Sequence, residues 1–331
     1  MKKVFWLILG VVFTLQAKAQ KIYADGFTHT YSIVARDSIT GEIGVAVQSH
    51  WFSVGSVVTW GEAGVGVIAT QAFVNKSFGI EGLKLLKQGK TPQETMKILL
   101  AADSGRDVRQ LAIMDAKGNV ATYTGKLCID AAGHITGPNF SVQANMMNNA
   151  KVWPAMSKTF QETKGSLSER MLAALEAAQA VGGDIRGQQS AAMMIFKGTS
   201  EGKPWDEKVL DIRVEDSKAP LKELRRLVMI NNAYEHMANG DLAMEKNDAT
   251  TALKEYGKAE SMLPDNIEMR YWHAVTLVNK GKIEESLPIF RYVFTKEDSW
   301  VELTRRIRKI GMLTVSDQDL ALILKQRGAR K

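Results

Sequence analysis

Alternating hydrophobic and polar residues predict a run of short strands near the start of the chain. Segments rich in valine, isoleucine, threonine and aromatic residues are separated by glycine-bearing turns, as is typical of strands. They cover residues 31–35, 43–48, 57–60 and 65–70. The turn at residues 37–42 carries aspartate, serine and glycine, which favours a hairpin. Antiparallel pairing would therefore bring Thr30, at the start of the first strand, near Gln48 and His50, at the end of the second.

The pattern changes to helical spacing further along the chain. Apolar residues recur every three to four positions in residues 77–87, 92–102, 154–163 and 167–181, which predicts helices. Thr91 with Glu94, and Ser166 with Glu169, have the spacing of a capping box. Further strands are predicted at residues 109–115, 119–124, 140–145, 188–196 and 209–214. This order of strands and helix pairs predicts an α+β fold with two sheets covered by helices on both outer faces.

From about residue 219 the pattern is almost entirely helical, and two segments repeat at a spacing of 34 residues. Gly240 and Ala274 occupy equivalent positions, as do Tyr256 and Phe290. This pattern resembles tetratricopeptide repeats, in which small residues permit close helix contact and aromatic residues fill the groove between repeats. We therefore predict an all-α helical-repeat domain over residues 219–313, followed by a basic C-terminal tail over residues 314–331. An ordinary bundle of helical hairpins is the alternative.

Five sequence blocks carry a more specific resemblance. They are TYSIVARD, GEIGVAVQS, AGVGVIATQAF, RQLAIMD and GGDIRGQQSAA, in this order between about Thr30 and Asp216. Together they resemble the bacterial family known as domain of unknown function 1028, which is similar to the N-terminal nucleophile (Ntn) hydrolases. The resemblance implies a four-layer αββα sandwich over residues 30–216. It implies no particular substrate, because none is established for the family.

The first residues have the pattern of a secretory signal peptide. Two lysines precede an apolar run at residues 4–15, and an A-x-A cleavage site follows at residues 17–19. About a dozen apolar residues are too few to span a bilayer, so a signal peptide at residues 1–19 is favoured over a membrane anchor. We expect an exported protein, periplasmic or secreted, without stable membrane insertion. Residues 20–29 would form a short leader ahead of the first strand.

Composition narrows the classes of function. The net charge of +7 falls to +4 once Lys2, Lys3 and Lys18 of the signal peptide are removed, which is too mild to indicate a nucleic-acid partner. Cys128 is the only cysteine and lies in an apolar run, so packing is favoured over catalysis. The histidines lack metal-ligand spacing, and the glycine pattern at residues 64–69 continues into a strand rather than a helix. We therefore expect neither a metal nor a cofactor.

Thr30 is the sharpest candidate for chemistry. In an Ntn hydrolase the first residue attacks a carbonyl with its side chain, while its own α-amine acts as the general base. Family members without a signal peptide often begin with Met-Thr, so the resemblance carries this role onto Thr30. Here a further cleavage between His29 and Thr30 would be needed to free the amine. The alternative is that Thr30 is simply a β-branched strand residue.

Other polar residues near strand ends are candidates for the same site. His50 could move a proton near neutral pH, and Asn145 could support the reaction as a hydrogen-bond donor. The candidate substrate-binding residues are Gln48, Gln71, Asn75, Arg186 and Gln188. Each candidate has a plainer alternative. The amides often satisfy turn backbone, His50 can be a loop residue, and Arg186 can pair with Asp184.

Two functions remain open from the sequence. The first is an amidohydrolase that cleaves an amide in a small molecule, a peptide or a cell-wall fragment, with Thr30 as the nucleophile. The second is a non-catalytic binding protein that holds a ligand in the same cleft. In either case the helical repeats could bind a protein partner, and the chain could form a homo-oligomer.

Overall fold

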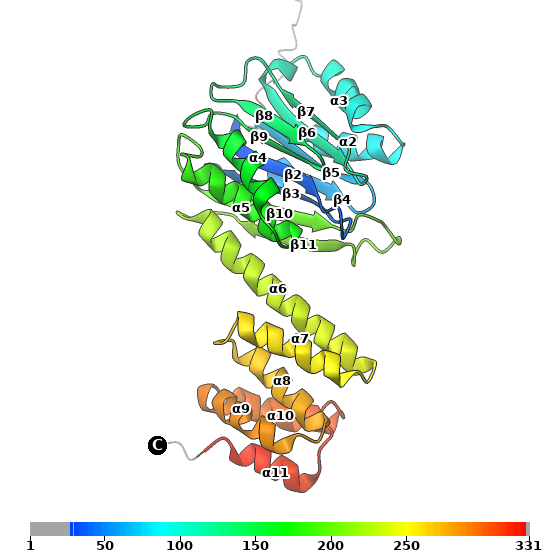
Figure 1. Cartoon of the computed structure of the whole chain (residues 1–331), viewed down its shortest axis with the longest axis vertical. Coiled ribbons are helices and arrows are strands. Elements are labelled where there is room, and N and C mark those ends of the chain that lie inside the picture. Colours follow the sequence, from blue (N-terminus) through cyan, green and yellow to red (C-terminus); the bar gives the residue numbers. More distant parts are fainter. Residues whose placement is uncertain (1–26, 29, 329–331) are drawn as a thin grey trace, which may run out of the picture.

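The computed structural model describes residues 27–28 and 30–328, which form two parts joined by one long helix (Figure 1). The first part combines antiparallel sheets with helices, and the second part is helical. The coarse fold class predicted from the sequence is thereby confirmed. The predicted signal peptide at residues 1–19 lies outside the described residues, as does most of the predicted leader at residues 20–29.

One sheet has five strands in the order β1–β5–β6–β7, with β4 also paired to β5. The strands are β1 (Phe27–Thr28), β4 (Thr59–Glu62), β5 (Gly66–Phe73), β6 (Arg109–Asp115) and β7 (Val120–Thr124). Every pairing in this sheet is antiparallel. Phe27 pairs with Phe73, and Thr28 pairs with Ala72. Part of the predicted leader is therefore an edge strand of this sheet.

The other sheet has six strands in the order β11–β10–β3–β2–β9–β8. The strands are β2 (Thr30–Arg36), β3 (Ile43–Ser49), β8 (Gly133–Gly137), β9 (Phe140–Ala144), β10 (Ser190–Phe196) and β11 (Lys208–Val214). The predicted hairpin is the pair β2 and β3, in which Thr30 lies opposite Ser49 and Tyr31 lies opposite Gln48. Its register sets which side chains share a face with Thr30.

Two helix pairs accompany the sheets, and the first part also holds two short helices. The longer helices are α2 (Ser77–Lys87), α3 (Pro92–Ala101), α4 (Val152–Glu162) and α5 (Leu167–Ala180). The short ones are α1 (Gly55–Val58) and the 3₁₀ helix η1 (Arg106–Val108). Both predicted capping boxes are present, at the starts of α3 and α5. The strand predicted at residues 57–60 is divided instead, because its first half belongs to α1 and its second half to β4.

Apolar side chains form separate clusters on the faces of the sheets. One cluster contains side chains from both sheets, among them Val34, Val47, Val67 and Ala112. The opposite face of the six-stranded sheet packs against α4 and α5, as in the contact of Phe140 with Phe160. The opposite face of the five-stranded sheet packs against α2 and α3. Side chains at alternate positions of one strand therefore enter different clusters.

The second part consists of helices that follow one another along the chain (Figure 1). They are α6 (Pro220–Glu245), α7 (Ala249–Met262), α8 (Ile267–Asn279), α9 (Ile283–Lys296), α10 (Ser299–Lys309) and α11 (Asp317–Lys325). Leu224 and Val228 of α6 belong to the same cluster as α4 and α5. Ala233 and Met237, further along α6, belong to a cluster with α7. One helix therefore contributes to the cores of both parts.

The proposed repeat positions are buried in this helical part. Tyr256 is 3% exposed and Phe290 is 0% exposed. A Cβ atom at Gly240 would lie only 2.5 Å from the Tyr256 ring, so a small residue is required there for α6 to approach α7. The predicted basic tail contains α11, whose Ile323 is buried. Within the described residues no helix is both long and apolar enough to cross a membrane.

Candidate functional site

Buried polar side chains gather at one end of the space between the two sheets. They alternate with apolar residues along β2, β5, β6 and β9, and each is 0% exposed. The set comprises Thr30, Ser32, Gln71, Gln110, Ser141, Gln143 and Asn145. Val34 lies on the same face of β2 as Ser32, and Val67 lies on the same face of β5 as Gln71. Both valines belong to the apolar cluster formed by the two sheets. The polar residues therefore extend that cluster towards the start of β2.

A chain of hydrogen bonds links these side chains across the two sheets. Gln143 Nε2 donates to Ser32 Oγ at 2.6 Å, and Ser32 Oγ donates to Gln71 Oε1 at 2.6 Å. Gln71 Nε2 then donates to Gln110 Oε1 at 2.7 Å. Because buried polar groups are costly unless they are bonded, this connected network fixes the rotamers of its members.

The network converges on the backbone carbonyl of Thr30. Asn145 donates to this oxygen from its backbone nitrogen at 3.1 Å and from Nδ2 at 3.4 Å. Gln71 Nε2 donates to the same oxygen at 3.3 Å. Asn145 Nδ2 also donates to Gln110 Oε1 at 2.9 Å. Gln71 and Asn145, two residues selected from the sequence, thus lie together at Thr30, and their amides hold its backbone.

Gln110 extends the network to the edge where β7 meets β8. Its Nε2 lies 2.8 Å from Thr124 Oγ1 and 2.9 Å from the Ala144 carbonyl oxygen. Thr124 Oγ1 lies 2.8 Å from His134 Nδ1, and His134 is exposed. Although the residue is exposed overall, neighbouring residues desolvate its imidazole, which lowers the pKa of His134. Sequence reasoning missed Gln110, although its place among fully buried strand residues was a usable signal.

His50 lies at the same end of the six-stranded sheet but is exposed to solvent. Its backbone nitrogen donates to Asp184 Oδ2 at 3.1 Å. Asp184 is 2% exposed and accepts two hydrogen bonds from the Arg186 guanidinium, at 3.0 Å from Nε and 2.7 Å from Nη2. Gln188 follows in the same loop and is half-buried. The Arg186 guanidinium thus neutralises a buried carboxylate next to His50, and substrate roles for His50, Arg186 and Gln188 stay predictions.

The structure places Gln48 on the other face of the sheet from Thr30. Gln48 lies opposite Tyr31, whose hydroxyl donates to Gln179 of α5 at 3.0 Å. Gln48 is 0% exposed, and neither polar atom of its amide has a hydrogen-bond partner among the described residues. Burial, and secondly the negative charge of Asp184, raises the pKa of Tyr31. Gln48 therefore lies beneath the helices rather than beside the other predicted site residues.

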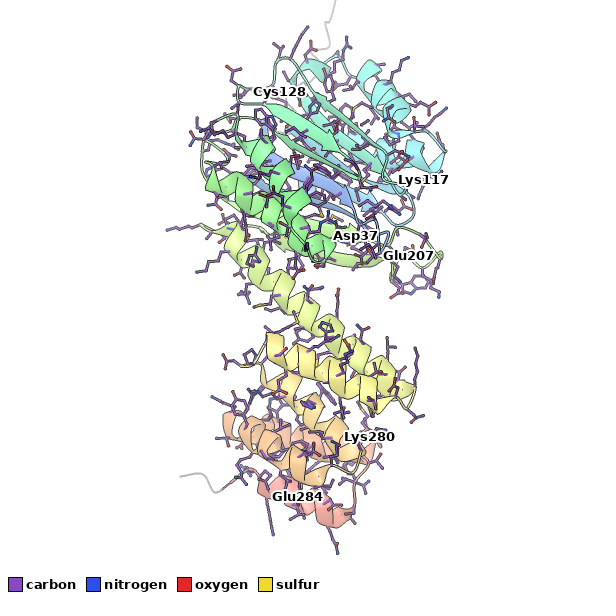
Figure 2. The ribbon with its side chains drawn as sticks, in the orientation of Figure 1. Asp37, Lys117, Cys128, Glu207, Lys280 and Glu284 are labelled. Carbon is purple, nitrogen blue, oxygen red and sulfur yellow. The ribbon has the colours of Figure 1, made fainter. Side chains whose placement is uncertain are left out.

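Asn75 and Cys128 have local roles in the structure. Asn75 Oδ1 accepts hydrogen bonds from the backbone nitrogen of Ser77 at 3.1 Å and from its hydroxyl at 2.7 Å, at the start of α2. Burial raises the pKa of the Cys128 thiol to about 11, so the thiol is neutral at physiological pH. It lies in the first part of the chain and donates to the Arg109 carbonyl oxygen at 3.3 Å (Figure 2). Thiolate chemistry at Cys128 is therefore disfavoured.

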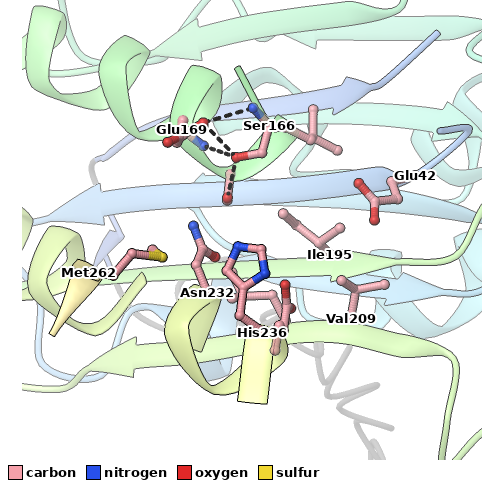
Figure 3. Close-up of a pocket in the computed structure, with 12 residues that line it drawn as sticks. Glu42, Ser166, Glu169, Ile195, Val209, Asn232, His236 and Met262 are labelled. Atoms are coloured by element: carbon pink, nitrogen blue, oxygen red, sulfur yellow. Dashed lines mark hydrogen bonds between the residues drawn. The ribbon is translucent and has the colours of Figure 1, made fainter. Parts of the chain in front are cut away.

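A separate pocket of about 330 Å³ lies where the six-stranded sheet and the start of α5 meet α6 and α7 (Figure 3). Its lining includes Glu42, Glu169, Asn232, His236 and Met262. Burial of the carboxyl group raises the pKa of Glu42. The lining contains none of the site residues predicted from the sequence. Across the described residues, no group of three or more histidine, cysteine, aspartate or glutamate side chains could hold a metal ion.

Comparisons with known proteins define the class of this chain. Residues 30–224 match the model of DUF1028, described as a family of unknown function, and the chain belongs to that family. The match covers every strand of both sheets except β1 and includes the first turn of α6. Among curated proteins, none matches this chain.

Several solved structures are similar to this chain, among them one from Silicibacter pomeroyi and one from Yersinia bercovieri. The crystal structure of SPO2555 from Silicibacter pomeroyi, a DUF1028 protein, is 32% identical with a TM-score of 0.56, and the match covers 61% of this chain and 85% of that one. Anbu (ancestral beta-subunit) from Yersinia bercovieri is 13% identical with a TM-score of 0.30, covering 60% of this chain and 92% of that one. The second likeness is too weak to carry an argument.

Proposed function

We propose that residues 30–216 form an Ntn-hydrolase-like four-layer αββα sandwich and that the chain is an amidohydrolase with Thr30 as its nucleophile. The observation that carries this proposal is the convergence of Gln71 and Asn145 on the Thr30 carbonyl at the start of β2. Burying seven polar residues costs free energy of desolvation, which an apolar core would avoid. The hydrogen bonds of this network hold Thr30 at the start of β2, as is needed for a nucleophile whose position must be accurate.

The proposed chemistry uses the hydroxyl and the α-amine of Thr30. The hydroxyl oxygen would attack the carbonyl carbon of an amide, and its proton would pass to the α-amine. Collapse of the tetrahedral intermediate would break the carbon–nitrogen bond, and the departing amine would take that proton. Water would then hydrolyse the ester on Thr30 and restore the hydroxyl. Gln71 and Asn145 would position Thr30, because their amide donors are directed at its carbonyl oxygen.

This chemistry requires cleavage between His29 and Thr30, since a peptide nitrogen cannot act as the base. Thr30 is 0% exposed in a chain that still carries β1 on its N-terminal side. Among the described residues, β1 pairs with β5 at two positions. We propose that cleavage releases β1 with the rest of the leader and opens Thr30 to substrate.

The surroundings of the reaction follow from the same proposal. Export would be directed by the signal peptide proposed at residues 1–19. The substrate would be an amide in a small molecule, a peptide or a cell-wall fragment, and His50 would lie near its entry as a polar group. The helical part, proposed to be tetratricopeptide-like over residues 219–313, would hold a protein partner.

A substitution series tests the nucleophile. A panel of amide substrates would be offered to the chain that begins at Thr30 and to its variants. Thr30→Ala should abolish hydrolysis, Thr30→Ser should retain part of it, and the rates would be followed by release of the amine. Thr40→Ala is the matched control, because Thr40 lies exposed in the turn at the other end of the β2–β3 hairpin. Hydrolysis that survives Thr30→Ala would refute the assignment.

A further inference from the structure

The helical part contains a groove that is separate from the proposed catalytic site. Its volume is about 580 Å³, and it is formed by α6, α7, α8 and the loop after α10. Trp272, Met244 and Met312 supply apolar and aromatic surface, while Asp241 and Glu245 supply carboxylates. A groove of this size can take several side chains of a ligand.

The acidic side of the groove is built from successive turns of α6. Asp241 and Glu245 are four residues apart, so their side chains lie on the same face of the helix. Tyr256, buried where α7 meets α6, donates its hydroxyl to Asp241 Oδ1 at 2.5 Å. This bond fixes the carboxylate of Asp241 at the groove. Burial, and secondly the bond to Asp241, raises the pKa of Tyr256, so its hydroxyl keeps the proton that it donates.

The negative charge of the groove is uncompensated among the described residues. No lysine or arginine lines it. The ion pairs that α6 makes among the described residues involve Glu223, Arg225, Arg226 and His236 rather than Asp241 or Glu245. Elsewhere on the same helical part some exposed acids do have basic partners, as Glu285 has Lys282 and Glu302 has Arg306. In a chain with a net charge of +7, an acidic groove without cations is complementary to a positively charged ligand.

Apolar surface continues beyond the groove along the loop that closes it. Ile310 is 72% exposed and Met312 is 50% exposed, on either side of the lining residue Gly311. Large exposed apolar side chains next to a groove are typical of a surface that contacts another protein. A compact small amine would leave this surface uncovered, whereas an extended chain would cover it.

We propose that this groove binds an extended segment of a partner protein that presents a lysine or arginine beside an apolar side chain. The cationic group lies between Asp241 and Glu245, and the apolar side chain packs on Trp272 and Met312. The site rests on and deepens the partner-binding role proposed for the helical part. It is independent of the proposed hydrolase chemistry, because it uses no residue of the sheets.

Pools of synthetic pentapeptides test the charge preference directly. In each pool the four flanking positions vary among apolar residues and the central residue is fixed. The pools differ in that central residue, which is lysine, arginine, norleucine or glutamate. Binding to the full chain is measured by fluorescence anisotropy in low salt. The lysine and arginine pools should bind about fivefold or more tighter than the norleucine pool, and added salt should weaken that preference.

Substitutions in the groove test whether it causes the preference for a cationic residue. The double variant Asp241→Asn, Glu245→Gln keeps the side-chain shapes and should lose the preference, with an unchanged circular-dichroism spectrum. Glu284→Gln is the control, because Glu284 is an exposed acid on α9 outside the groove (Figure 2). Failure of every pool to bind, a preference for glutamate, or a lysine preference that survives the double variant would each overturn the proposal.

Discussion

At the residue scale, the proposed site depends on amides whose hydrogen bonds rely on one another. Gln110 Oε1 accepts from both Gln71 and Asn145, and those two amides also donate to the Thr30 carbonyl. Removing Gln110 would leave two buried donors with a partner missing. Gln48 is equally buried, yet its amide has no partner among the described residues. The two glutamines therefore form a natural comparison.

We expect Gln110→Met to lower the free energy of unfolding by about 1–3 kcal/mol, because it leaves buried donors unsatisfied. Gln48→Met changes the side chain in the same way but removes only an unbonded amide, so stability should stay the same or rise. Urea denaturation of both variants measures the difference. Equal losses of unfolding free energy in the two variants would mean that the Gln48 amide is hydrogen-bonded, which would contradict the expected difference between the two glutamines.

The sequence could locate some of these residues but not their connections. Thr30 lies at one end of a hairpin that local turn chemistry predicts, so its place at a strand start was accessible. Gln110 lies in the other sheet, and nothing local indicates which strands of two sheets face each other. Gln48 shows the effect of register, because it pairs with Tyr31 rather than with Thr30. A shift of one position sends a side chain to the opposite face.

At the scale of elements, the helices and strands that could be predicted are those with a clear signal in their own sequence. The capping boxes that start α3 and α5 need only four consecutive residues, and both are present. β8 is absent from the predicted strands although it forms a short hairpin with β9, because it begins and ends with glycine and its composition gives little strand signal. α1 occupies a valine-rich segment whose helical turn is set by surrounding contacts rather than by propensity.

α6 carries a buried leucine and an exposed leucine that should respond differently to substitution. Leu224 is 0% exposed in the core shared with α4 and α5, so Leu224→Ala should lower the free energy of unfolding by about 2–5 kcal/mol. Leu242 is 50% exposed in the same helix, and Leu242→Ala should change it by no more than about 0.5 kcal/mol. Thermal or urea unfolding compares the two. A silent Leu224→Ala would contradict the view that α6 helps to form the first core.

At the scale of the whole molecule, the two parts offer different chemistry. The sheets enclose a buried polar network at Thr30, and the helices present an acidic groove. α6 joins them, because its buried residues enter the core of each part (Figure 1). The predicted domain boundary at residues 216–219 precedes this helix. The first turn of α6 nevertheless belongs to the family match, and residues from Leu221 to Val228 contribute to the first core.

The central claim is that Thr30 becomes a free N-terminus, and N-terminal sequencing tests it most directly. The protein would be purified from its natural compartment, and its intact mass would be measured alongside. The account predicts a species that begins at Thr30 and that carries the amide-hydrolysing activity. A chain that begins only at Gln20 and still hydrolyses amides, with or without the Thr30 hydroxyl, would contradict it.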